Sequence, residues 1–470
     1  MDYRIFAPDK IVMEVELPAS KSISNRMLIL NALCGGELHN VARCDDTDAM
    51  RRALATDTTA SGAVATVNIG AAGTAMRFLT AYYATLEGST VILDGTERMR
   101  HRPIALLVDA LRRCGADIEY AGEEGFPPLR ITGRKLSASH IEIAGNVSSQ
   151  YISALLMVAP LMGCRTVTLT GEIISLPYIT MTLTLMRLMG VDCVMNGNNI
   201  SIPADAHYVP CDFTVENDWS AASYWLEMQS LLPESRITLK GLHSESAQGD
   251  SAVAGIFSQM GVTATITPTV THLTAIEPQN ATAHEGSRHG ATEPQNATAH
   301  VGSRLGATEP QNATAHVGSR HGATGQHYTL TPLTLDLKET PDLAQTIVVT
   351  ACLLGRHFHI TGLRTLRIKE TDRIDALCTQ LRRLGYIITA GDDFSLSWNG
   401  ERCAPEPEPH ISTFDDHRMA MAFAPAAVLF PGIVIDDVEV VSKSYPDFWR
   451  HLEAAGFTLT PCERRKEAPK

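Results

Sequence analysis

A cluster of cations and hydroxyls at residues 20–26 has the composition of an anion-binding site. The stretch reads SKSISNR and follows a short strand-like run. Serine hydroxyls favour helix starts, and the apolar spacing that follows predicts a helix to about residue 33. Lys21, Ser22 and Arg26 would then surround the positive end of a helix dipole, where free backbone N–H groups also point outward. An ordinary capped surface helix with solvated basic residues is the alternative.

Five more stretches carry basic residues in comparable positions. They are IGAAGTAMRFL at 69–79, RMRHRPI at 98–104, IKETDRI at 368–374, FDDHRMAMAF at 414–423 and VSKSYPDFW at 441–449. In the first, Gly70 and Gly73 let backbone N–H groups approach an anion, and Thr74 is expected to cap the helix. In the second, four cations precede a Pro at an expected first helical position. In the third, Lys369 and Arg373 are four residues apart, which predicts one shared helix face.

A pattern of elements repeats along the chain about every 70–76 residues, once a 48-residue insertion is set aside. An amphipathic helix ends at a glycine and a strand-like run follows at once, which is typical of a left-handed helix stop. These glycines are Gly115, Gly190, Gly261, Gly385 and Gly456. A second helix in each unit begins with small polar residues. With a degenerate first unit the chain has six units, most simply three per domain, in an α/β fold. A doubly wound sheet is the competing fold.

The cations share one placement, at the start of an element in nearly every unit, and this predicts a cleft. A repeat fold brings equivalent starts to one side of each domain, and two such faces opposed would enclose the cations. The lining cations would be Lys21, Arg26, Arg102, Lys369, Arg373, Arg418 and Lys443. Guanidinium groups bind phosphate and carboxylate in bidentate geometry, so a small, multiply charged anion is the expected ligand. Asp342 and Glu370 are the acids available for proton transfer. Taken singly, each stretch is more typical of a solvated face or a helix cap.

Residues 277–324 contain three near copies of a 16-residue sequence, which reads EPQNATAHEGSRHGAT in the first copy. The repeat is rich in Ala, Thr, Gly, Asn and His and has almost no large apolar residues, so it cannot build a core. We therefore predict a flexible surface loop inserted in the second domain. Loose metal binding by its histidines is the alternative.

Bulk composition narrows the class of protein. A chain of 470 residues is too long for one compact core, so two domains are expected. The formal net charge of −13 argues against nucleic acid or an anionic membrane as a partner. The ten cysteines form no C-x-x-C pair, which suggests neither a zinc site nor a disulfide framework and fits a cytoplasmic location. The sequence shows no signal peptide, membrane span or dinucleotide fingerprint.

Together and in this order, the stretches resemble the 5-enolpyruvylshikimate-3-phosphate synthases of the enolpyruvyl transferase family. The matching pieces are PASKSISNR, AGTAMR, RHRPI, VSSQY, ISLPYI, the PD of TPDLAQT, RIKETDRI, DDHRMAMAF and KSYPDF. The resemblance implies a two-domain α/β fold, an inside-out α/β barrel of six βαβαββ units with three in each domain. Domain 1 would comprise residues 18–216, and domain 2 residues 1–17 and 217–470.

The resemblance also implies a reaction. The enolpyruvyl group of phosphoenolpyruvate would pass to the 5-hydroxyl of shikimate 3-phosphate with release of phosphate, step six of the shikimate pathway toward chorismate. These two small molecules would be the partners, and neither a metal nor an organic cofactor is implied. Glyphosate would compete with phosphoenolpyruvate. The enzyme is expected to be a cytoplasmic monomer.

By position, the resemblance assigns roles to the motif residues. Shikimate 3-phosphate would be held by Lys21, Ser22, Arg26, Ser148, Ser149, Gln150, Ser175, Asp342, Thr365 and Lys369. Phosphoenolpyruvate would be held by Lys21, Gly73, Arg102, Gln150, Arg373, Arg418 and Lys443. The implied catalytic residues are Asp342, which would accept the proton of the 5-hydroxyl, and Glu370 with Lys21, which would manage the proton at the methylene carbon.

Four positions depart from the family pattern. Ala71 stands where Asn is expected, and Phe78 stands where Pro is expected. Leu176 replaces a common Lys, and Thr365 replaces an Asn that commonly contacts the substrate. Thr365 retains one hydroxyl donor, whereas the missing Pro bears on the geometry of the helix at residue 73.

Two other functions are compatible with parts of the pattern. The sibling transferase that acts on UDP-N-acetylglucosamine carries Lys-Asn where this chain has Lys21-Ser22, and it has a loop cysteine near residues 98–103, where this chain has none. A non-catalytic phosphosugar-binding repeat protein would not need Asp342 and Glu370 beside the cations.

Overall fold

Buried apolar side chains form two separate cores in a computed structural model, which describes residues 1–58, 64–276 and 331–462. The first core is built by residues 19–215, and the second by residues 5–17 together with 219–457. Both cores belong to one compact unit. The expected domain boundaries, 17/18 and 216/217, lie in the gaps between the two sets of core residues.

The two chain crossings between the cores run antiparallel and pair with each other. Ala19 forms a bridge with Asn217. The Ser20 backbone N–H donates to the Glu216 carbonyl at 2.8 Å, and the Asp218 N–H donates to the Pro18 carbonyl at 2.8 Å. The starts of two helices, one from each core, are thereby fixed next to each other.

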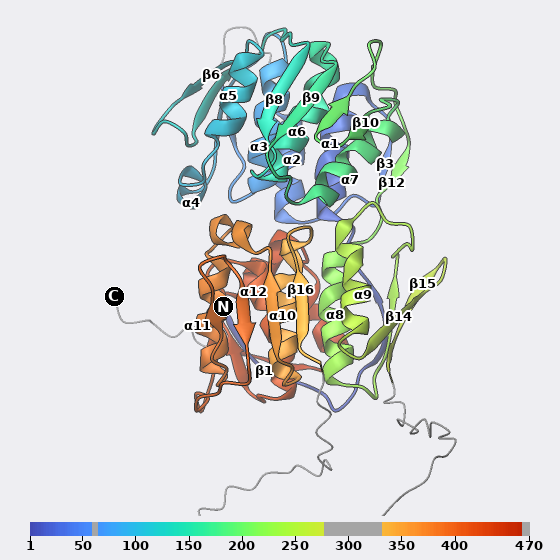
Figure 1. Cartoon of the computed structure of the whole chain (residues 1–470), viewed down its shortest axis with the longest axis vertical. Coiled ribbons are helices and arrows are strands. Elements are labelled where there is room, and N and C mark those ends of the chain that lie inside the picture. The colour runs from blue at the N-terminus through green and yellow to red at the C-terminus, as the bar shows by residue number, and fades with distance from the viewer. Residues whose placement is uncertain (59–63, 277–330, 463–470) are drawn as a thin grey trace, which may run out of the picture. The chain divides into compact units, whose positions relative to one another are not determined.

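Five four-stranded sheets share one topology, which is the expected βαβαββ unit. The first two strands are parallel, the fourth lies antiparallel beside the second, and the third pairs antiparallel with the fourth. A parallel pair needs a crossover, and one helix of each unit supplies it, whereas antiparallel neighbours need only a turn. The sheets stay separate in the structure (Figure 1).

The first core contains two complete units and a short one. The complete units are β4 (Ala65–Asn68), α3 (Gly73–Thr85), β5 (Thr90–Asp94), α4 (Glu97–Arg100), α5 (Ala105–Arg113), β6 (Asp117–Tyr120) and β7 (Leu129–Thr132), then β8 (His140–Ala144), α6 (Ser149–Val158), η1 (Ala159–Met162), β9 (Thr166–Thr170), α7 (Leu176–Leu188), β10 (Val194–Asn196) and β11 (Asn199–Ser201). The short unit comprises α1 (Lys21–Cys34), β3 (Leu38–His39), α2 (Asp45–Ala55) and β12 (Phe213–Thr214). Within the described residues its sheet is the single parallel pair of β12 and β3, so the first unit is degenerate, as expected.

The second core contains three complete units. The first two are β2 (Val12–Glu16), α8 (Trp219–Leu231), β13 (Arg236–Lys240), η2 (Gly249–Ala252), α9 (Val253–Ser258), β14 (Val262–Ile266) and β15 (Val270–Ala275), then β16 (Leu333–Asp336), η3 (Pro341–Leu343), α10 (Ala344–Leu353), β17 (Phe358–Thr361), η4 (Arg364–Ile368), α11 (Arg373–Arg383), β18 (Thr389–Ala390) and β19 (Leu396–Trp398). The third is β20 (His410–Ile411), α12 (His417–Phe423), η5 (Ala424–Val428), β21 (Ile433–Ile435), η6 (Val438–Lys443), α13 (Phe448–Ala454), β22 (Thr458–Cys462) and β1 (Asp2–Phe6).

The N-terminal segment completes two of these units. Strand β2 pairs in parallel with β13, and strand β1 lies antiparallel between β21 and β22. In Figure 1 the blue N-terminal strand accordingly runs among the orange and red elements. The second core therefore contains both ends of the described chain.

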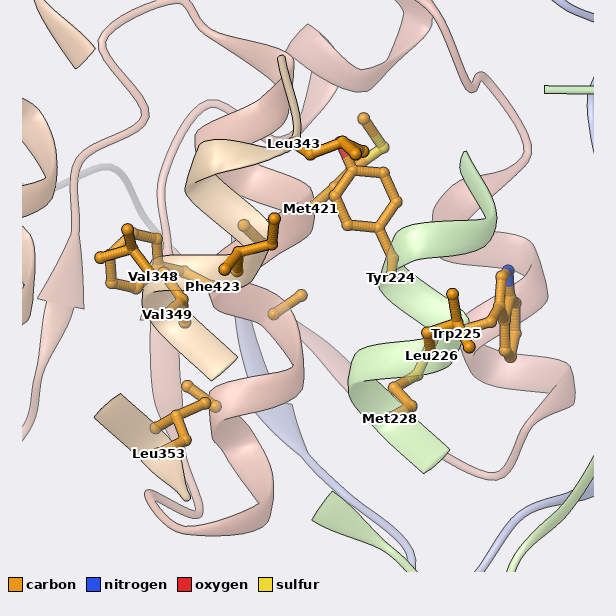
Figure 2. Close-up of a cluster of buried hydrophobic side chains, with 14 of the residues drawn as sticks. Tyr224, Trp225, Leu226, Met228, Leu343, Val348, Val349, Leu353, Met421 and Phe423 are labelled. Carbon is orange, nitrogen blue, oxygen red and sulfur yellow. The ribbon is translucent and has the colours of Figure 1, made fainter. Parts of the chain in front are cut away.

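The helices of each unit divide into an inner and an outer one. All ten residues of α10 and all seven of α12 are buried, and most of α8 is buried as well, so these three inner helices are enclosed on all sides. Figure 2 shows side chains of the three helices, including Tyr224, Val348 and Phe423, gathered in this core. Because the inner helices cannot turn a polar face outward, their only free parts are their ends.

The outer helices end as the glycine pattern predicts. Each of the five glycines has a φ between +88° and +96°, which is the left-handed region that side chains avoid. A strand follows within a few residues in all five cases. The predicted helix stops are confirmed.

The 16-residue repeat lies outside the described residues, between strands that belong to two different sheets. The connection from β15 to β16 spans 57 residues, and without the 48 residues of the repeat it would span 9. The equivalent connections, β11 to β12 and β19 to β20, span 11 residues each. The repeat therefore replaces nothing that the unit pattern requires.

We predict that deletion of residues 277–324 leaves the fold intact. Shortening a flexible connection changes its closure entropy by only about 0.6 kcal/mol per halving, so the thermal midpoint Tm should stay within roughly 3 °C or rise slightly. Calorimetry of the deletion variant measures this, and deletion of the single copy 293–308 is the matched control. A Tm drop that grows with the number of copies removed would show that the repeat supports the fold.

Candidate active site

The inner helices of both cores point their N-terminal ends at one pocket. Its lining residues are Lys21, Ser22, Arg26, Asp46, Gly73, Thr74, Arg77, Arg102, Pro103, Ser148, Ser149, Gln150, Tyr151, Ser175, Tyr178, Asp342, Thr365, Ile368, Lys369, Glu370, Arg373, His417 and Arg418. Every predicted site residue except Lys443 is among them. Seven of these residues are Lys or Arg and three are Asp or Glu, so the pocket carries an excess of positive charge in a protein of net charge −13.

Side-chain caps fix the helix ends that form the pocket. The Ser20 hydroxyl accepts from the N–H of Ile23 at 3.5 Å, and the Ser148 hydroxyl accepts from that of Gln150 at 3.4 Å. Asp218 Oδ1 accepts from the N–H of Ser220 at 2.8 Å at the start of α8. Such caps are the local signal that polar residues before an apolar run provide.

The guanidinium of Arg373 is the centre of the site on the second core. Its Nε donates to Asp416 Oδ2 at 2.6 Å, its Nη1 donates to Asp342 Oδ1 at 3.0 Å, and its Nη2 donates to Glu370 Oε2 at 3.0 Å. Arg373 is 1% exposed and Asp416 is fully buried. Burial alone would lower the pKa of Arg373, but Asp416, Glu370 and Asp342 together raise it. Arg373 is therefore a permanent buried cation.

Asp342 precedes α10 and holds three cations. Its Oδ1 lies 3.1 Å from Lys369 Nζ and 3.0 Å from Arg373 Nη1, and its Oδ2 lies 3.3 Å from Arg418 Nη2. Burial by itself would raise the pKa of Asp342. The charges of Lys369, Arg418 and Arg373 outweigh burial and hold that pKa well below its ordinary value. Asp342 is therefore ionised.

Glu370 is the second carboxylate of the cluster. Its Oε2 accepts from Arg373, and its Oε1 accepts from Lys443 Nζ at 2.8 Å. Burial would raise the pKa of Glu370, but Lys443 and Arg373 in particular hold it well below the ordinary value. Lys443 reaches the site through Glu370, although it lines a neighbouring hollow with Asp46 and Ala71 rather than the pocket itself.

The cations of the first core have fewer carboxylate partners. Arg26 is 3% exposed and donates to the hydroxyls of Thr182 and Ser153, at 2.7 and 3.1 Å. Burial lowers its pKa to about 10, so it stays charged at neutral pH, and no carboxylate pairs with it among the described residues. Lys21 Nζ lies 3.5 Å from Asp46 Oδ2. A buried arginine without a carboxylate partner is an anion site in waiting.

Gly73 and Arg102 meet at the start of α3. A Cβ atom on Gly73 would lie 2.6 Å from Arg102 Nη1, so the guanidinium packs directly on the glycine backbone. Arg102 Nε is buried without a hydrogen-bond partner in the described part of the protein. The hydroxyl of Thr365 is likewise buried and unpartnered, and both residues line the pocket. Two orphaned donors facing one pocket fit a polar ligand there.

The remaining predicted residues lie at the pocket wall with different local roles. Ser148 caps α6, Ser149 begins it, and Gln150 Nε2 donates to the Thr74 hydroxyl at 3.1 Å. Ser175 precedes α7 in a left-handed conformation (φ 55°) and is 6% exposed. These hydroxyl and amide groups complete the wall on the side of the first core.

Two of the departures from the family pattern are accommodated in this wall. Phe78 is buried in α3, and the Arg26 guanidinium carbon lies 5.4 Å from the centre of its ring, within cation–π range. Leu176 is the first residue of α7. The helix at Gly73 forms without the expected Pro.

Three local predictions were wrong. Lys369 and Arg373 do not share a helix, because Asp372 caps α11 and the helix starts only at Arg373; the two cations meet instead through Asp342. Pro103 is not the first helical residue, since α5 starts at Ala105. Thr74 does not cap α3, which it enters as its second residue behind Ala72.

Several pocket residues were not predicted as site residues. Asp46 and Tyr178 line the pocket, and Asp416 binds Arg373 from behind. Arg77 is buried, and its Nη1 donates to the Gly73 carbonyl at 3.1 Å. The D-D-H-R sequence signals a helix cap at Asp416, but its contact with Arg373 joins residues 43 positions apart and has no local signal.

His417 is the least satisfied side chain of the site. It is 2% exposed, and neither ring nitrogen has a hydrogen-bond partner among the described residues. Burial, with Lys21, Lys443 and Arg418 nearby, holds its pKa well below the ordinary value, so the ring is neutral and makes no ion pair with Asp416.

Two further searches concern the described residues only. They contain no cluster of three or more His, Cys, Asp or Glu side chains arranged to hold a metal ion. None of their helices has the length and apolar character needed to cross a membrane.

Six repeated units whose helix ends converge on a cationic pocket define an α/β protein built to bind small polyanions. The family model for EPSP synthase (3-phosphoshikimate 1-carboxyvinyltransferase) matches residues 55–289 and 289–452. A 3-phosphoshikimate 1-carboxyvinyltransferase of Bacteroides fragilis (strain YCH46) is 46% identical over 465 residues, which cover 98% of this chain and 99% of that protein. The chain therefore belongs to the EPSP synthase family.

Other comparisons agree. A 3-phosphoshikimate 1-carboxyvinyltransferase of Cellvibrio japonicus is 35% identical over 463 residues, covering 93% of this chain and 95% of that protein. The solved structure of EPSP synthase from Acinetobacter baumannii superposes with a TM-score of 0.68 at 20% identity and covers 98% of this chain and all of that one. The two-domain α/β fold implied by the resemblance is confirmed. Family membership also decides against the UDP-N-acetylglucosamine transferase and the non-catalytic repeat protein.

We predict that Asp416→Asn destabilises the protein by about 3 kcal/mol, because it removes one carboxylate from a buried ion pair and leaves part of the Arg373 charge uncompensated. Asparagine keeps the helix cap, so capping does not contribute to the loss. Thermal unfolding measures the effect. Asp415→Asn is the matched control, because Asp415 is the exposed neighbour, and its αL backbone suits asparagine. Equal Tm values for the two variants would contradict the central place given to the Arg373–Asp416 pair.

Proposed function

We propose that this protein transfers the enolpyruvyl group of phosphoenolpyruvate to the 5-hydroxyl of shikimate 3-phosphate and releases phosphate. The observation that carries the proposal is the pocket itself, in which seven cations surround two ionised acids, Asp342 and Glu370. Two substrates that together carry two phosphates and two carboxylates need such an excess of positive charge. Family membership supplies the reaction class.

In the proposed reaction the 5-oxygen of shikimate 3-phosphate bonds to C2 of phosphoenolpyruvate while the methylene carbon gains a proton. Phosphate then leaves C2 as the same carbon loses a proton. Asp342 accepts the proton of the 5-hydroxyl, and Glu370 with Lys21 serves the methylene carbon. The addition intermediate is strongly anionic, and preorganised cations stabilise such charge most where water is excluded.

The geometry supports two subsites for the substrates. On the side of the first core, Arg26 and the serines at 22, 148, 149 and 175 offer donors for shikimate 3-phosphate, with Gln150, Thr365 and Lys369 completing the ring. Arg102, Arg373, Arg418 and Lys443 offer charge for phosphoenolpyruvate, with Gly73 allowing close approach. Lys21 stands between the two groups and contacts both ligands in this proposal.

The enzyme is proposed to work in the cytoplasm and as a monomer. All ten cysteines are free thiols in the structure, which suits a reducing compartment. The pocket draws its lining from one chain, so a second copy is not required for its chemistry. Sedimentation of the purified protein measures the oligomeric state.

Phosphate release tests the proposed function directly. Purified protein should release phosphate from phosphoenolpyruvate only when shikimate 3-phosphate is present. Release that proceeds equally without shikimate 3-phosphate, or no release in its presence, would refute the proposal. UDP-N-acetylglucosamine in place of shikimate 3-phosphate is the control acceptor and should give no release.

We expect Asp342→Asn to lower kcat by roughly 10²–10⁴, because the amide keeps the shape of the side chain but cannot accept the proton. Arg418→Ala should mainly raise KM for phosphoenolpyruvate, since it removes a binding cation rather than the base. Steady-state kinetics with each substrate varied in turn separates the two effects. A nearly fully active Asp342→Asn variant would show that another group is the base.

We expect Gly73→Ala to raise KM for phosphoenolpyruvate by roughly tenfold, because the new methyl group displaces the Arg102 guanidinium and weakens one charged contact. Inhibition by glyphosate should weaken more than turnover at saturating substrate. Gly255→Ala in α9, where a Cβ meets nothing within 4 Å, is the matched control and should change neither. If the two variants behaved alike, Arg102 would not be fixed by Gly73.

A further inference from the structure

Asp250 is a buried carboxylate beside the pocket that the proposed reaction does not use. It lies in η2, is 4% exposed, and is bound by two hydroxyl groups. The Tyr178 hydroxyl donates to its Oδ1 at 3.0 Å, and the Ser220 hydroxyl donates to its Oδ2. Tyr178 belongs to α7 of the first core and Ser220 to α8 of the second, so Asp250 joins the two cores.

Each of these hydroxyl partners leads to a different subsite. Tyr178 lines the pocket, and its carbonyl accepts from Arg26 Nη2 at 3.3 Å. Ser220 Oγ accepts from Arg418 Nη2 at 3.4 Å, and the same guanidinium holds Asp342. A continuous set of contacts thus runs from the proposed shikimate 3-phosphate side to the proposed phosphoenolpyruvate side, with Asp250 in the middle.

The backbone around Asp250 is fixed at the crossing between the cores. Gln248 Nε2 donates to the Asn217 carbonyl at 2.7 Å, and Gln248 Oε1 accepts from the Trp219 N–H at 3.2 Å. Gly249 packs against Pro177 so closely that a Cβ atom would lie 2.2 Å from the proline Cβ. Asp250 is therefore held in place and cannot follow its partners if they move.

We propose that Asp250 is a positioning residue that couples the two subsites, holding Tyr178 on one side and, through Ser220, Arg418 on the other. The inference rests on the proposed function, since it names a residue that supports both substrates of that reaction. Both hydroxyls donate to Asp250, so both contacts require its ionised form, in which each oxygen is purely an acceptor.

The charges around Asp250 make this coupling sensitive to pH. The groups that face it are Tyr178 of α7, Asp218 and Ser220 of α8, Asp342 of η3 and Arg418 of α12. Burial raises the pKa of Asp250 to about 6, and Asp342 adds to this, while Arg418 opposes it. Asp250 is thus ionised at pH 7.5 and becomes protonated as the pH falls through 6. Protonation puts a donor on one oxygen and disrupts one of the two contacts.

The test uses the full-length enzyme with Asp250→Asn, Tyr178→Phe, Ser220→Ala and the two double variants that contain Asp250→Asn. Glu245→Gln, an exposed carboxyl of the same loop, is the control. We expect Asp250→Asn to raise KM for both substrates by about tenfold at pH 7.5, the loss of one contact to a charged group on each side. Tyr178→Phe should raise KM only for shikimate 3-phosphate, and Ser220→Ala only for phosphoenolpyruvate.

Two readouts separate positioning from a general structural role. In the Asp250→Asn background, Tyr178→Phe and Ser220→Ala should each add less than about twofold, because the contact they remove is already lost. The wild type should lose affinity for both substrates between pH 7 and 5 more steeply than Asp250→Asn does. Substrate phosphates also titrate in this range, and comparison of the two proteins removes their common contribution.

The outcomes distinguish this inference from the proposed function. If the wild type releases no phosphate with both substrates, the proposed function fails and this inference fails with it. If the wild type is active but Asp250→Asn matches Glu245→Gln, or if the single and double variants are simply additive, only the coupling role of Asp250 is overturned. If Asp250→Asn does not fold, the selectivity of the two hydroxyl variants decides, and equal effects on both substrates would refute the role.

Discussion

The buried guanidinium of Arg373 is the interaction on which the site depends. It pairs with three carboxylates that come from three places in the chain: before α10, before α11 and at the cap of α12. An unpaired charge at 1% exposure would be very costly, so the three segments can reach their native positions only together. A lysine could not replace it, because a single ammonium lacks the planar fork that reaches three acceptors at once.

The repeated unit explains why such a cluster forms at all. Each inner helix is a crossover between parallel strands, so each one starts at the same edge of its sheet. The helices are enclosed by their core and expose only their ends, and three units per core bring three N-termini together. The charge that function requires is therefore placed at positions where packing has no use for apolar side chains.

Sequence patterns predicted the parts of this architecture that rest on local rules. The helix stops at Gly115 and Gly385, the polar starts of the inner helices and the unit count follow from spacing and backbone conformation. The resemblance then supplied nearly all of the residues that line the pocket. Interactions between distant residues could not be predicted in this way. Asp416 looks like a helix cap, and its pairing with Arg373 exists only because α11 and α12 adjoin in space.

The same limit explains the wrong prediction for residues 368–374. Spacing by four favours one helix, but Asp372 satisfies the first free N–H groups of α11 with its own carboxylate, at 3.1 and 3.2 Å, and the helix begins there. Lys369 is left outside the helix and turns toward Asp342. Capping chemistry thus overrode periodicity, and the site gained a cation that approaches from a loop rather than from a helix face.

The low pKa of Asp342 raises a question for its proposed role, because a carboxylate held by three cations is a weak base. The question is resolved by the partners themselves. Lys369, Arg373 and Arg418 are among the groups proposed to bind the substrate anions, so binding divides their charge between Asp342 and the ligands. Each added negative charge nearby raises the pKa of Asp342 toward the range where it can take a proton. In this mechanism the carboxylates balance the cations until the substrates arrive, and the arrival of the substrates is what makes Asp342 a competent base.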